Sequence, residues 1–436
     1  MKIVLVLLNE FLAKSRGKKL SLVGRKGAYA PSTLTTLASL VPQELSAEIV
    51  LFDEFIESFD PHTIQADIVG LSFTTTNAFH AYNLAAILKK RGITVVFGGY
   101  HTTALPTEAS MYADACVIGY AERSWPKLLL DFQRGDLKKI YQEPYDQDFL
   151  DLNTIRYDLL KKKKYFYPFT LEYSRSCNNS CKFCVIPSFS NGGLVCRPIQ
   201  NVCRDIKEIG GKNIVFLDSS PTENIEGFTE LCLALKPLKI NWYTNGTFKV
   251  ADNPELIKLM SESGCRGLLV GFESINQSSL DDQEKSFNKV DKYKDFIKLL
   301  HQHKIYVLAS IVFGFDNDDP SVFKKTVKFV NDCNIDVVHY AILTPFPGSP
   351  LFESLKKQGR ILTENWSLYD SLHITFRPKR MTPEELQKGF DWAYLKTHSL
   401  PSILKRNLCS PTGSIFTIMG NVALGIYGYN VIKANK

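Results

Sequence analysis

The 436-residue sequence has no long run of charge of one sign. Its net charge of +7 comes from 52 basic and 45 acidic residues, and its one basic run covers residues 161–164. Such a short run is more typical of a solvated linker or helix face than of a phosphate-binding patch. A basic stripe with interleaved aromatic residues is also absent, which argues against a nucleic-acid-binding module.

A secretory signal peptide is missing as well. The opening MKIVLVLLNEF has a short apolar run but no small-residue cleavage site, so it is predicted to be a buried first strand. We therefore expect a cytoplasmic protein, in which the ten scattered cysteines are reduced. In a reducing compartment, a cysteine cluster is better explained by a metal than by disulfides.

The composition is that of a folded chain, with 44% hydrophobic and 22% charged residues, and the length predicts two to three domains. The first 135 residues alternate helix-like stretches with strands expected at residues 2–8, 48–52, 67–73, 94–99 and 115–120. These strands are apolar on both faces, as in parallel sheets covered by helices. They predict a doubly wound, flavodoxin- or Rossmann-like domain over residues 1–135, whose ligand lies beyond the carboxyl ends of the strands.

Three loops rich in small, polar or glycine residues collect at that predicted edge. They are SFTTT (72–76), GGYHTT (98–103) and GYAERSW (119–125). Each loop taken alone is explained by a tight strand-to-helix turn. Three such loops at one sheet edge favour a large flat ligand that the backbone approaches closely.

A second alternation begins after residues 136–168, which lack periodicity and are predicted to be a linker. Its strands are expected at residues 169–174, 213–218, 240–244, 267–272, 306–314 and 337–343. Six strand–helix repeats predict a partial (β/α)6 TIM-type barrel over residues 169–375, with chemistry on the carboxyl-end loops. A short helical C-terminal region is predicted for residues 376–436.

The stretch 410–432 contains no charged residue. A helix packed on the barrel or on a partner is the favoured interpretation, and an interfacial membrane helix comes next. A true membrane span is the least favoured, because the stretch contains Gly, Asn, Ser, Thr and Tyr.

Three cysteines follow the first predicted barrel strand, in the sequence SRSCNNSCKFCVIP. They are Cys177, Cys181 and Cys184, and no second cysteine pair with zinc-knuckle spacing accompanies them. Structural zinc usually takes four closed ligands, so it is the weaker alternative. A [4Fe–4S] cluster held by only three thiolates keeps one iron open to a small molecule.

The Cys-x3-Cys-x2-Cys spacing, with Phe183 before the last cysteine, resembles the signature of the radical S-adenosylmethionine (SAM) superfamily. The resemblance covers most of residues 169–380. It implies that the open iron binds the amino and carboxylate groups of SAM, and that one electron from the cluster cleaves SAM to methionine and a 5′-deoxyadenosyl radical.

Further motifs of this family are matched at later strand ends, in FLDSSPT, YTNGT, VGFES and VFGFDNDD. FLDSSPT departs from the family's Gly-Gly-Glu form. For each loop, glycine or proline that only shapes a turn is the alternative. The resemblance implies SAM-binding roles for Phe183, Asp218, Ser219, Thr244, Asn245, Glu273, Ser274, Gly314 and Phe315; it names no catalytic residue.

The front domain resembles the cobalamin-binding domain that precedes this barrel in one large subgroup. GYAERSW departs from that subgroup's Gly-Glu-Gly-Glu, and the Asp-x-His-x-x-Gly motif that supplies a histidine ligand to cobalt is missing. His80 and His101 lie in the wrong contexts to replace that ligand. The cobalamin-binding candidates are Ser72, Thr74, Thr75, Gly98, Gly99, Tyr100, His101, Gly119, Tyr120 and Glu122.

The two resemblances together imply an anaerobic enzyme that methylates an unactivated carbon through the deoxyadenosyl radical and methylcobalamin. Its cofactors would be a [4Fe–4S] cluster, SAM and cobalamin, and its electron donor a flavodoxin or ferredoxin. The alternatives are a non-methylating radical cyclisation or rearrangement, and a front domain that no longer binds cobalamin. A lipid-like or polycyclic substrate and a peripheral membrane contact through the tail are further expectations.

Overall fold

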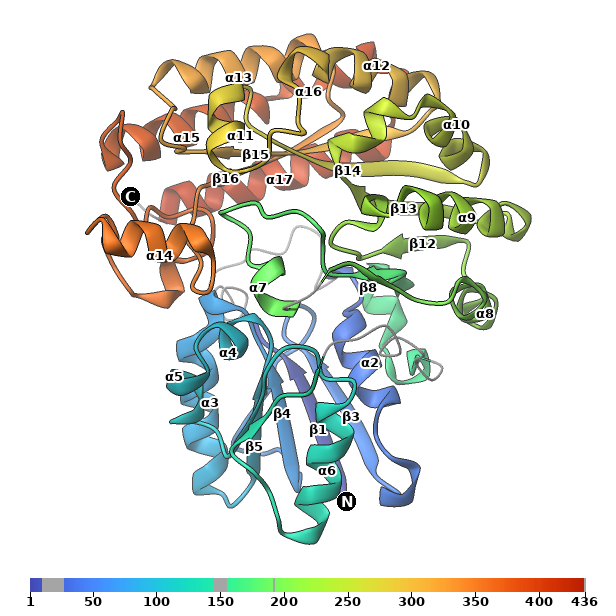
Figure 1. Ribbon diagram of the computed structural model, residues 1–436, viewed down its shortest axis with the longest axis vertical. Helices are drawn as coiled ribbons and strands as arrows, with labels where there is room; N and C mark the ends of the chain where they lie inside the picture. Colours follow the sequence, from blue (N-terminus) through green and yellow to red (C-terminus); the bar gives the residue numbers. More distant parts are fainter. Residues whose placement is uncertain (10–26, 145–154, 191–192, 435–436) are drawn as a thin grey trace. The chain divides into compact units, whose positions relative to one another are not determined.

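The computed structural model describes residues 1–9, 27–144, 155–190 and 193–434. The chain forms two compact units (Figure 1). The first comprises Met1–Ser176, Val185–Leu217 and Asn365–Ser367, and the second comprises Cys177–Cys184, Asp218–Glu364 and Leu368–Lys436. Both are α/β in architecture, with parallel strands, which confirms the predicted fold class.

The first unit contains a parallel sheet of six strands in the order β3-β1-β4-β5-β6-β7. Without β7, this is the 2-1-3-4-5 order of flavodoxin-like folds. The five predicted strands are confirmed, whereas β7 was not predicted because it is only two residues long. The bounds are β1 Lys2–Leu7, β3 Glu48–Asp53, β4 Ile68–Ser72, β5 Thr94–Gly98, β6 Ala115–Val117 and β7 Ile140–Tyr141.

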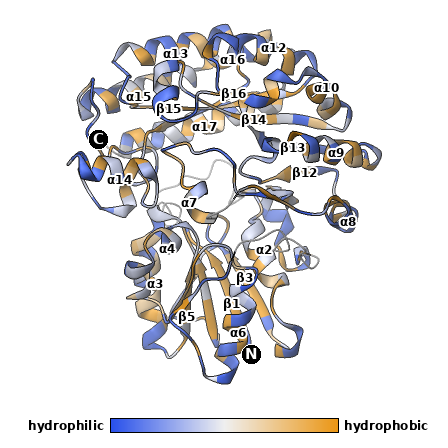
Figure 2. Ribbon diagram, in the orientation of Figure 1, coloured by the Kyte–Doolittle hydropathy of each residue, from blue (hydrophilic) through white to orange (hydrophobic). Residues whose placement is uncertain are grey.

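Helices cover both faces of this sheet, whose strands are the hydrophobic part of the unit (Figure 2). On one face, α2 (Ser32–Ser39) packs beside α6 (Ser124–Arg134), and Trp125 Nε1 donates to the Leu37 carbonyl at 3.2 Å. On the other face lies α3 (Ala78–Lys90), whose Tyr82 ring stacks on Phe97 of β5. The predicted doubly wound arrangement is therefore confirmed.

The rest of the first unit consists of short elements. β2 (Gly27–Tyr29) pairs with β8 (Tyr165–Tyr167), and β9 (Thr170–Leu171) pairs with β12 (Asn213–Phe216), both in parallel. β10 and β11 form an antiparallel pair. The remaining bounds are β10 Ser174–Arg175, α7 Ile186–Ser190, β11 Val195–Cys196 and α8 Ile199–Ile209. Residues 145–154 of the predicted linker lie outside the described residues.

The second unit contains the four longer barrel strands, each hydrogen-bonded in parallel to the next. These are β13 Asn241–Gly246, β14 Cys265–Glu273, β15 Tyr306–Phe313 and β16 Val337–Ile342. Helices follow the TIM-type alternation, as α9 Ile225–Leu235, α10 Pro254–Glu262, α11 Gln277–Asp282, α12 Tyr293–Gln302 and α13 Ser321–Asp332. All six predicted strand regions of the second alternation are present, as β9, β12 and β13 to β16.

The C-terminal part of the second unit is helical, as predicted. Its helices are α14 Pro350–Lys357, α15 Pro383–Thr397, α16 Leu400–Cys409 and α17 Ile415–Ala434. Helix α15 begins with a capping box, in which Thr382 and Glu385 satisfy each other's backbone N–H groups. Across the described part of the chain, we find no helix whose length and hydropathy would let it span a membrane.

Candidate active site

The cysteine loop, residues 177–184, belongs to the second unit and is held there by its backbone. The Lys182 N–H donates to the Gln283 carbonyl at 3.1 Å, and the Lys182 carbonyl accepts from the Leu351 N–H at 2.8 Å. Gln283 directly follows α11, and Leu351 lies in α14. Two separate elements therefore fix the loop that carries the three predicted ligands.

The three thiols of this loop lie near one another in a partly buried place. Burial, with the nearby Cys184 and Cys177 thiols, raises the pKa of the Cys181 thiol to about 12. Cys177 Sγ accepts hydrogen bonds from the Asn179 side chain at 3.2 Å and the Asn179 N–H at 3.5 Å. Hydrogen bonds to cysteine sulfur are one means by which proteins tune iron–sulfur clusters.

The arrangement of these thiols bears on which metal they can hold. Among the described residues, no three His, Cys, Asp or Glu side chains converge closely enough to bind a single metal ion. A tetrahedral zinc site requires such convergence. In a cubane cluster each thiolate binds its own iron, so the sulfurs stay apart. Three thiolate donors can each bind one iron of a cubane cluster, which leaves the fourth iron open to a small molecule.

A buried ion pair lies beside the thiols. Lys285 Nζ donates to Glu273 Oε1 at 2.7 Å, and both side chains are about one-tenth exposed. Burial lowers the pKa of Lys285, but the charges of Glu273 and Cys181 outweigh it and raise that pKa overall. Lys285 Nζ also lies 5.8 Å from the centre of the Phe183 ring. Glu273 and Phe183 are among the predicted SAM-binding residues, whereas Lys285 was not predicted.

Glu273 has an unusual backbone. Its φ is +60°, and the pairing of β14 with β15 shifts register between Gly271 and Glu273. A non-glycine residue with positive φ is strained and is found where the surrounding structure fixes it, often at functional sites. The bulge interrupts the regular alternation of side chains along β14, and the Glu273 carboxylate points toward Lys285.

The turn after β15 brings Gly314 and Phe315 to the cysteine loop. The Phe183 and Phe315 rings lie 6.1 Å apart, edge to face. Asp318 Oδ2 accepts from the N–H groups of Gly314 and Phe315 at 3.1 Å each, and it thereby closes the turn. Burial raises the pKa of Asp318 to about 6. Asp318 was not among the predicted site residues, although it directly follows them.

The remaining SAM-binding candidates differ in exposure. Asn245 Nδ2 donates to the Asp218 carbonyl at 2.7 Å, so these two strand ends are joined. Ser219 is exposed, whereas the Asp218 and Ser274 side chains are buried. Thr244 is also buried, on the opposite face of β13 from Asn245, because successive strand residues alternate.

A polar network that the sequence analysis missed ties the cysteine loop to the strand ends. Lys249 Nζ donates to Asn179 Oδ1 at 2.8 Å and to Glu223 Oε2 at 2.6 Å. Thr247 Oγ1 donates to Glu223 Oε1 at 2.9 Å. Asn179 is the residue that donates to Cys177 Sγ, so the network reaches a predicted cluster ligand.

In the first unit, the loops predicted to bind cobalamin meet at one sheet edge. Ser72, at the end of β4, pairs in register with Gly98, at the end of β5. In the loop after β4, Thr74 is exposed and Thr75 is buried. Thr74 Oγ1 lies 3.1 Å from Thr76 Oγ1, so this exposed loop is closed by its own hydroxyl groups.

The glycines of the second loop leave room at this edge. A Cβ added at Gly98 would meet nothing within 4 Å. At Gly99 the φ is +99°, and a Cβ would lie 2.5 Å from the Phe73 carbonyl oxygen. Only glycine therefore fits at position 99, and open space lies beside its neighbour. This cradle fits a bulky ligand that the backbone approaches.

Three aromatic side chains border the same edge of the first unit. The Phe189 ring lies 4.8 Å from the Tyr100 ring and 4.9 Å from the Tyr120 ring. Gly119, before Tyr120, has a φ of +75°. Tyr100, Gly119 and Tyr120 were predicted, whereas Phe189 was missed because it lies about 70 residues later, in α7.

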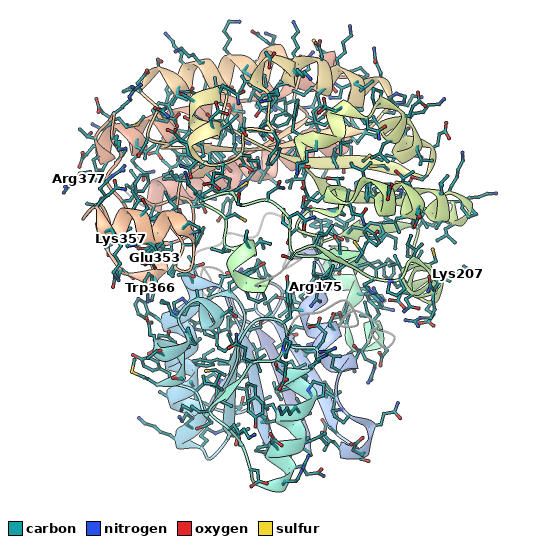
Figure 3. The ribbon with its side chains drawn as sticks, viewed as in Figure 1. Arg175, Lys207, Glu353, Lys357, Trp366 and Arg377 are labelled. Atoms are coloured by element: carbon teal, nitrogen blue, oxygen red, sulfur yellow. The ribbon has the colours of Figure 1, made fainter. Side chains whose placement is uncertain are left out.

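Glu122 lies in a buried charge cluster of the first unit. Its Oε1 pairs with Arg175, whose other guanidinium nitrogen donates to Glu172 at 2.6 Å. Of these three residues, Figure 3 labels Arg175. Burial raises the pKa of Glu122. Its Oε2 is buried and has no hydrogen-bond partner among the described residues.

His80 and His101, the two histidines weighed as cobalt ligands, both have protein partners. His101 is fully buried, and its Nε2 lies 2.9 Å from the Tyr82 hydroxyl. His80 Nε2 lies 3.0 Å from Glu54 Oε2. The burial of His101 separates it from the other cobalamin-binding candidates, most of which have exposed atoms.

Comparison with known proteins accounts for both regions. The radical SAM superfamily matches residues 171–330, and the B12 binding domain matches residues 44–129. An uncharacterised methyltransferase of Pyrococcus horikoshii is 30% identical over 456 aligned positions, which cover 95% of this chain and 96% of the relative. The chain belongs to the cobalamin-dependent radical SAM family.

Two further likenesses agree with this family. A bacteriochlorophyllide d C-12(1)-methyltransferase of Chlorobaculum tepidum is 27% identical over 93% of this chain and 91% of its own length. The fold is that of the radical SAM methyltransferase TsrM from Kitasatospora setae, solved with cobalamin and a [4Fe–4S] cluster. The TM-score is 0.65 at 14% identity, over 89% of this chain and 85% of TsrM. As a cobalamin-dependent radical SAM enzyme, the protein uses a [4Fe–4S] cluster, SAM and cobalamin as cofactors, as predicted.

Proposed function

We propose that this enzyme methylates an unactivated carbon of a small molecule. The observation that carries the proposal is the loop of three thiols at x3 and x2 spacing, beside the buried Lys285–Glu273 ion pair. When bound, the cluster and SAM supply the radical that removes a hydrogen atom, and cobalamin supplies the methyl group. The protein's part is to hold these groups, to orient the substrate and to exclude water.

In this proposal, the three cysteines bind the cluster, and the strand-end residues of the second unit bind SAM. The protonated Lys285 is a counter-charge for thiolates at Cys181 and its neighbours, which favours their ionised, metal-binding form. Asn179, held by Lys249, donates to Cys177 Sγ and fixes its orientation. At the first unit, the Gly98–Gly99 backbone and Glu122 Oε2 are the groups proposed to receive cobalamin.

The proposed substrate is lipid-like or polycyclic. The relative from Chlorobaculum tepidum is named for bacteriochlorophyllide d, a polycyclic small molecule. The aromatic share of 12% in this chain agrees with such a substrate but does not by itself require one.

We further propose that residues 1–135 bind cobalamin, 136–168 link the domains, 169–375 form the radical SAM barrel and 376–436 form a helical region. A flavodoxin or ferredoxin is the proposed electron donor, because SAM cleavage consumes one electron. The protein is proposed to work anaerobically in the cytoplasm and to contact a membrane peripherally through its C-terminal region.

The test is anaerobic turnover of the full-length enzyme with SAM, a reductant and a panel of polycyclic substrates that includes a bacteriochlorophyllide. We expect a product heavier by one methyl group, and 5′-deoxyadenosine that carries deuterium from a labelled substrate carbon. Deoxyadenosine formed together with a ring-closed or rearranged product of unchanged carbon count would overturn methylation and favour the cyclisation alternative.

A further inference from the structure

The last two helices, α16 and α17, form a hairpin that buries polar side chains together with the apolar Ile403 and Ile432. The helices pack against each other and are joined by residues 410–414. Five polar side chains of this hairpin are buried: Arg406, Asn407, Ser410, Thr417 and Asn421. A surface helix of a globular protein normally buries its apolar side instead.

Hydrogen bonds fix these buried polar side chains to the residues just before β16 and to the end of α15. The Arg406 guanidinium donates to the carbonyl oxygens of Ile335 at 2.8 Å and Thr397 at 3.0 Å. Asn421 Nδ2 donates to the Asp336 carbonyl at 2.7 Å, and Ser410 Oγ donates to Asp336 Oδ1 at 2.7 Å. The hairpin is thus anchored by a specific polar network, which determines which side faces outward.

The outward side is apolar. In α16, Leu400, Leu404 and Leu408 recur every four residues and therefore form one stripe, with exposed fractions of 64%, 44% and 79%. Just beyond the loop, Ile415 and Met419 of α17 are each 62% exposed. These five side chains define an apolar outer face on the hairpin. Exposed apolar patches of this kind mark interaction sites.

The charge of the region identifies the partner. Residues 392–436 contain no Asp or Glu and five basic residues, at positions 396, 405, 406, 433 and 436. Lys396, Lys405 and Lys433 are exposed. A second copy of the chain on this face would bring like charges together. A membrane with anionic headgroups instead offers both an apolar layer for the leucines and opposite charge for the lysines.

We propose that the α16–α17 hairpin docks on the surface of an anionic membrane, with the apolar outer face inserted into the headgroup region. The inference rests on the peripheral membrane contact proposed above, and it does not depend on the methyl-transfer chemistry. Such docking would place the enzyme beside a lipid-like or polycyclic substrate dissolved in the membrane.

The test is flotation of the full-length, anaerobically purified protein with vesicles of phosphatidylcholine alone or with phosphatidylglycerol added. We expect flotation only with the anionic vesicles, and at least a tenfold loss of binding in the double variant Leu404→Glu, Leu408→Glu. The matched control is Leu233→Glu, since Leu233 is 56% exposed in α9 but lies outside the hairpin. Lys405→Glu should weaken binding to anionic vesicles without creating binding to neutral ones.

Three results would overturn the proposal: no flotation of the wild-type protein, an equal loss in Leu233→Glu, or a wild-type dimer in light scattering that the double variant abolishes. The last would assign the face to a second copy of the chain. Cobalamin absorbance and SAM cleavage, measured in the same variants, should equal those of the wild type. A variant that loses vesicle binding but keeps its cofactors therefore tests membrane docking alone. A protein that binds vesicles but fails to methylate its substrate tests the proposed chemistry alone.

Discussion

The two units present their candidate sites by different physical means. In the second unit, the candidate site is made of side chains whose chemistry suits metal binding or that carry charge: three thiols and the Lys285–Glu273 pair. In the first unit, the site is made largely of backbone shape, with glycines that leave a cradle at a sheet edge. A thiolate cannot be replaced by another residue, whereas a cradle tolerates any change that keeps its shape. The candidate site of the second unit is therefore specified by residue identity, and that of the first unit by the absence of side chains.

The largest effect is expected when one thiol of the second unit's candidate site is removed. Cys181→Ala should abolish cluster assembly and SAM cleavage, because a cubane held at two corners loses a ligand that no neighbouring group replaces. Iron content and 5′-deoxyadenosine formation are the measurements. Cys333→Ala, a half-buried cysteine of the same unit, is the control and should keep both. Deoxyadenosine formed at the wild-type rate by Cys181→Ala would refute the ligand assignment.

The backbone site should respond to a single methyl group. Gly99→Ala places a Cβ against the Phe73 carbonyl at a φ of +99°, so the loop must move and cobalamin content should fall severalfold while iron is retained. Gly92→Ala is the matched control, because Gly92 also has positive φ, +76°, but open space around its Cβ position. Equal cobalamin content in both variants would remove the Gly98–Gly99 loop from the site.

In the second unit, the buried Lys285–Glu273 ion pair is expected to affect stability. Lys285→Met leaves the Glu273 carboxylate buried without its partner, which should lower the free energy of unfolding by about 3–5 kcal/mol. Denaturant unfolding of the apoprotein measures this loss. The double variant Lys285→Met, Glu273→Gln removes both charges and should recover much of it. If the double variant is no more stable than Lys285→Met, the unpaired Glu273 charge is not the cause of the lost stability.

A smaller effect is expected from Asp318, through pH. Burial raises its pKa to about 6, above the ordinary value for an unfolded chain. The folded state thus binds the Asp318 proton more tightly than the unfolded chain does. The stabilisation that this protonated side chain contributes is complete below about pH 4 and is lost as the pH rises through about 6. Between pH 4 and pH 7, the free energy of unfolding of the wild type should therefore fall by roughly 3 kcal/mol more than that of Asp318→Asn. Parallel pH curves for the two proteins would contradict this reasoning.

Local patterns predicted much of the fold. The apolar strands and the three cysteines are read from adjacent residues, and all eleven predicted strand regions contain a strand. Long-range features were missed. Lys285 and Phe189 meet their partners only through the fold, and β2 and β8 are three residues each, too short for periodicity to register. The sequence of β13 alternates with a period of two. This pattern could have predicted that Thr244 is buried and that Asn245 lies on the opposite face of the strand.

The hairpin illustrates a further limit of sequence reading. The leucines at positions 400, 404 and 408 fall on one helix face, which by itself predicts a buried stripe. The structure places that stripe outward because Arg406 and Asn421 bind backbone carbonyls of the strand region instead. Which side of an amphipathic helix faces the protein depends on hydrogen-bond partners that lie far away in the sequence.

We propose that the three-cysteine loop holds a four-iron cluster with one iron open to SAM. Electron paramagnetic resonance of the anaerobically purified, reduced protein tests it most directly, alongside iron, sulfide and zinc analysis. We expect about four irons and four sulfides for each chain, and a cluster signal that shifts when SAM is added. Zinc in place of iron, or a cluster signal that SAM leaves unchanged, would contradict it.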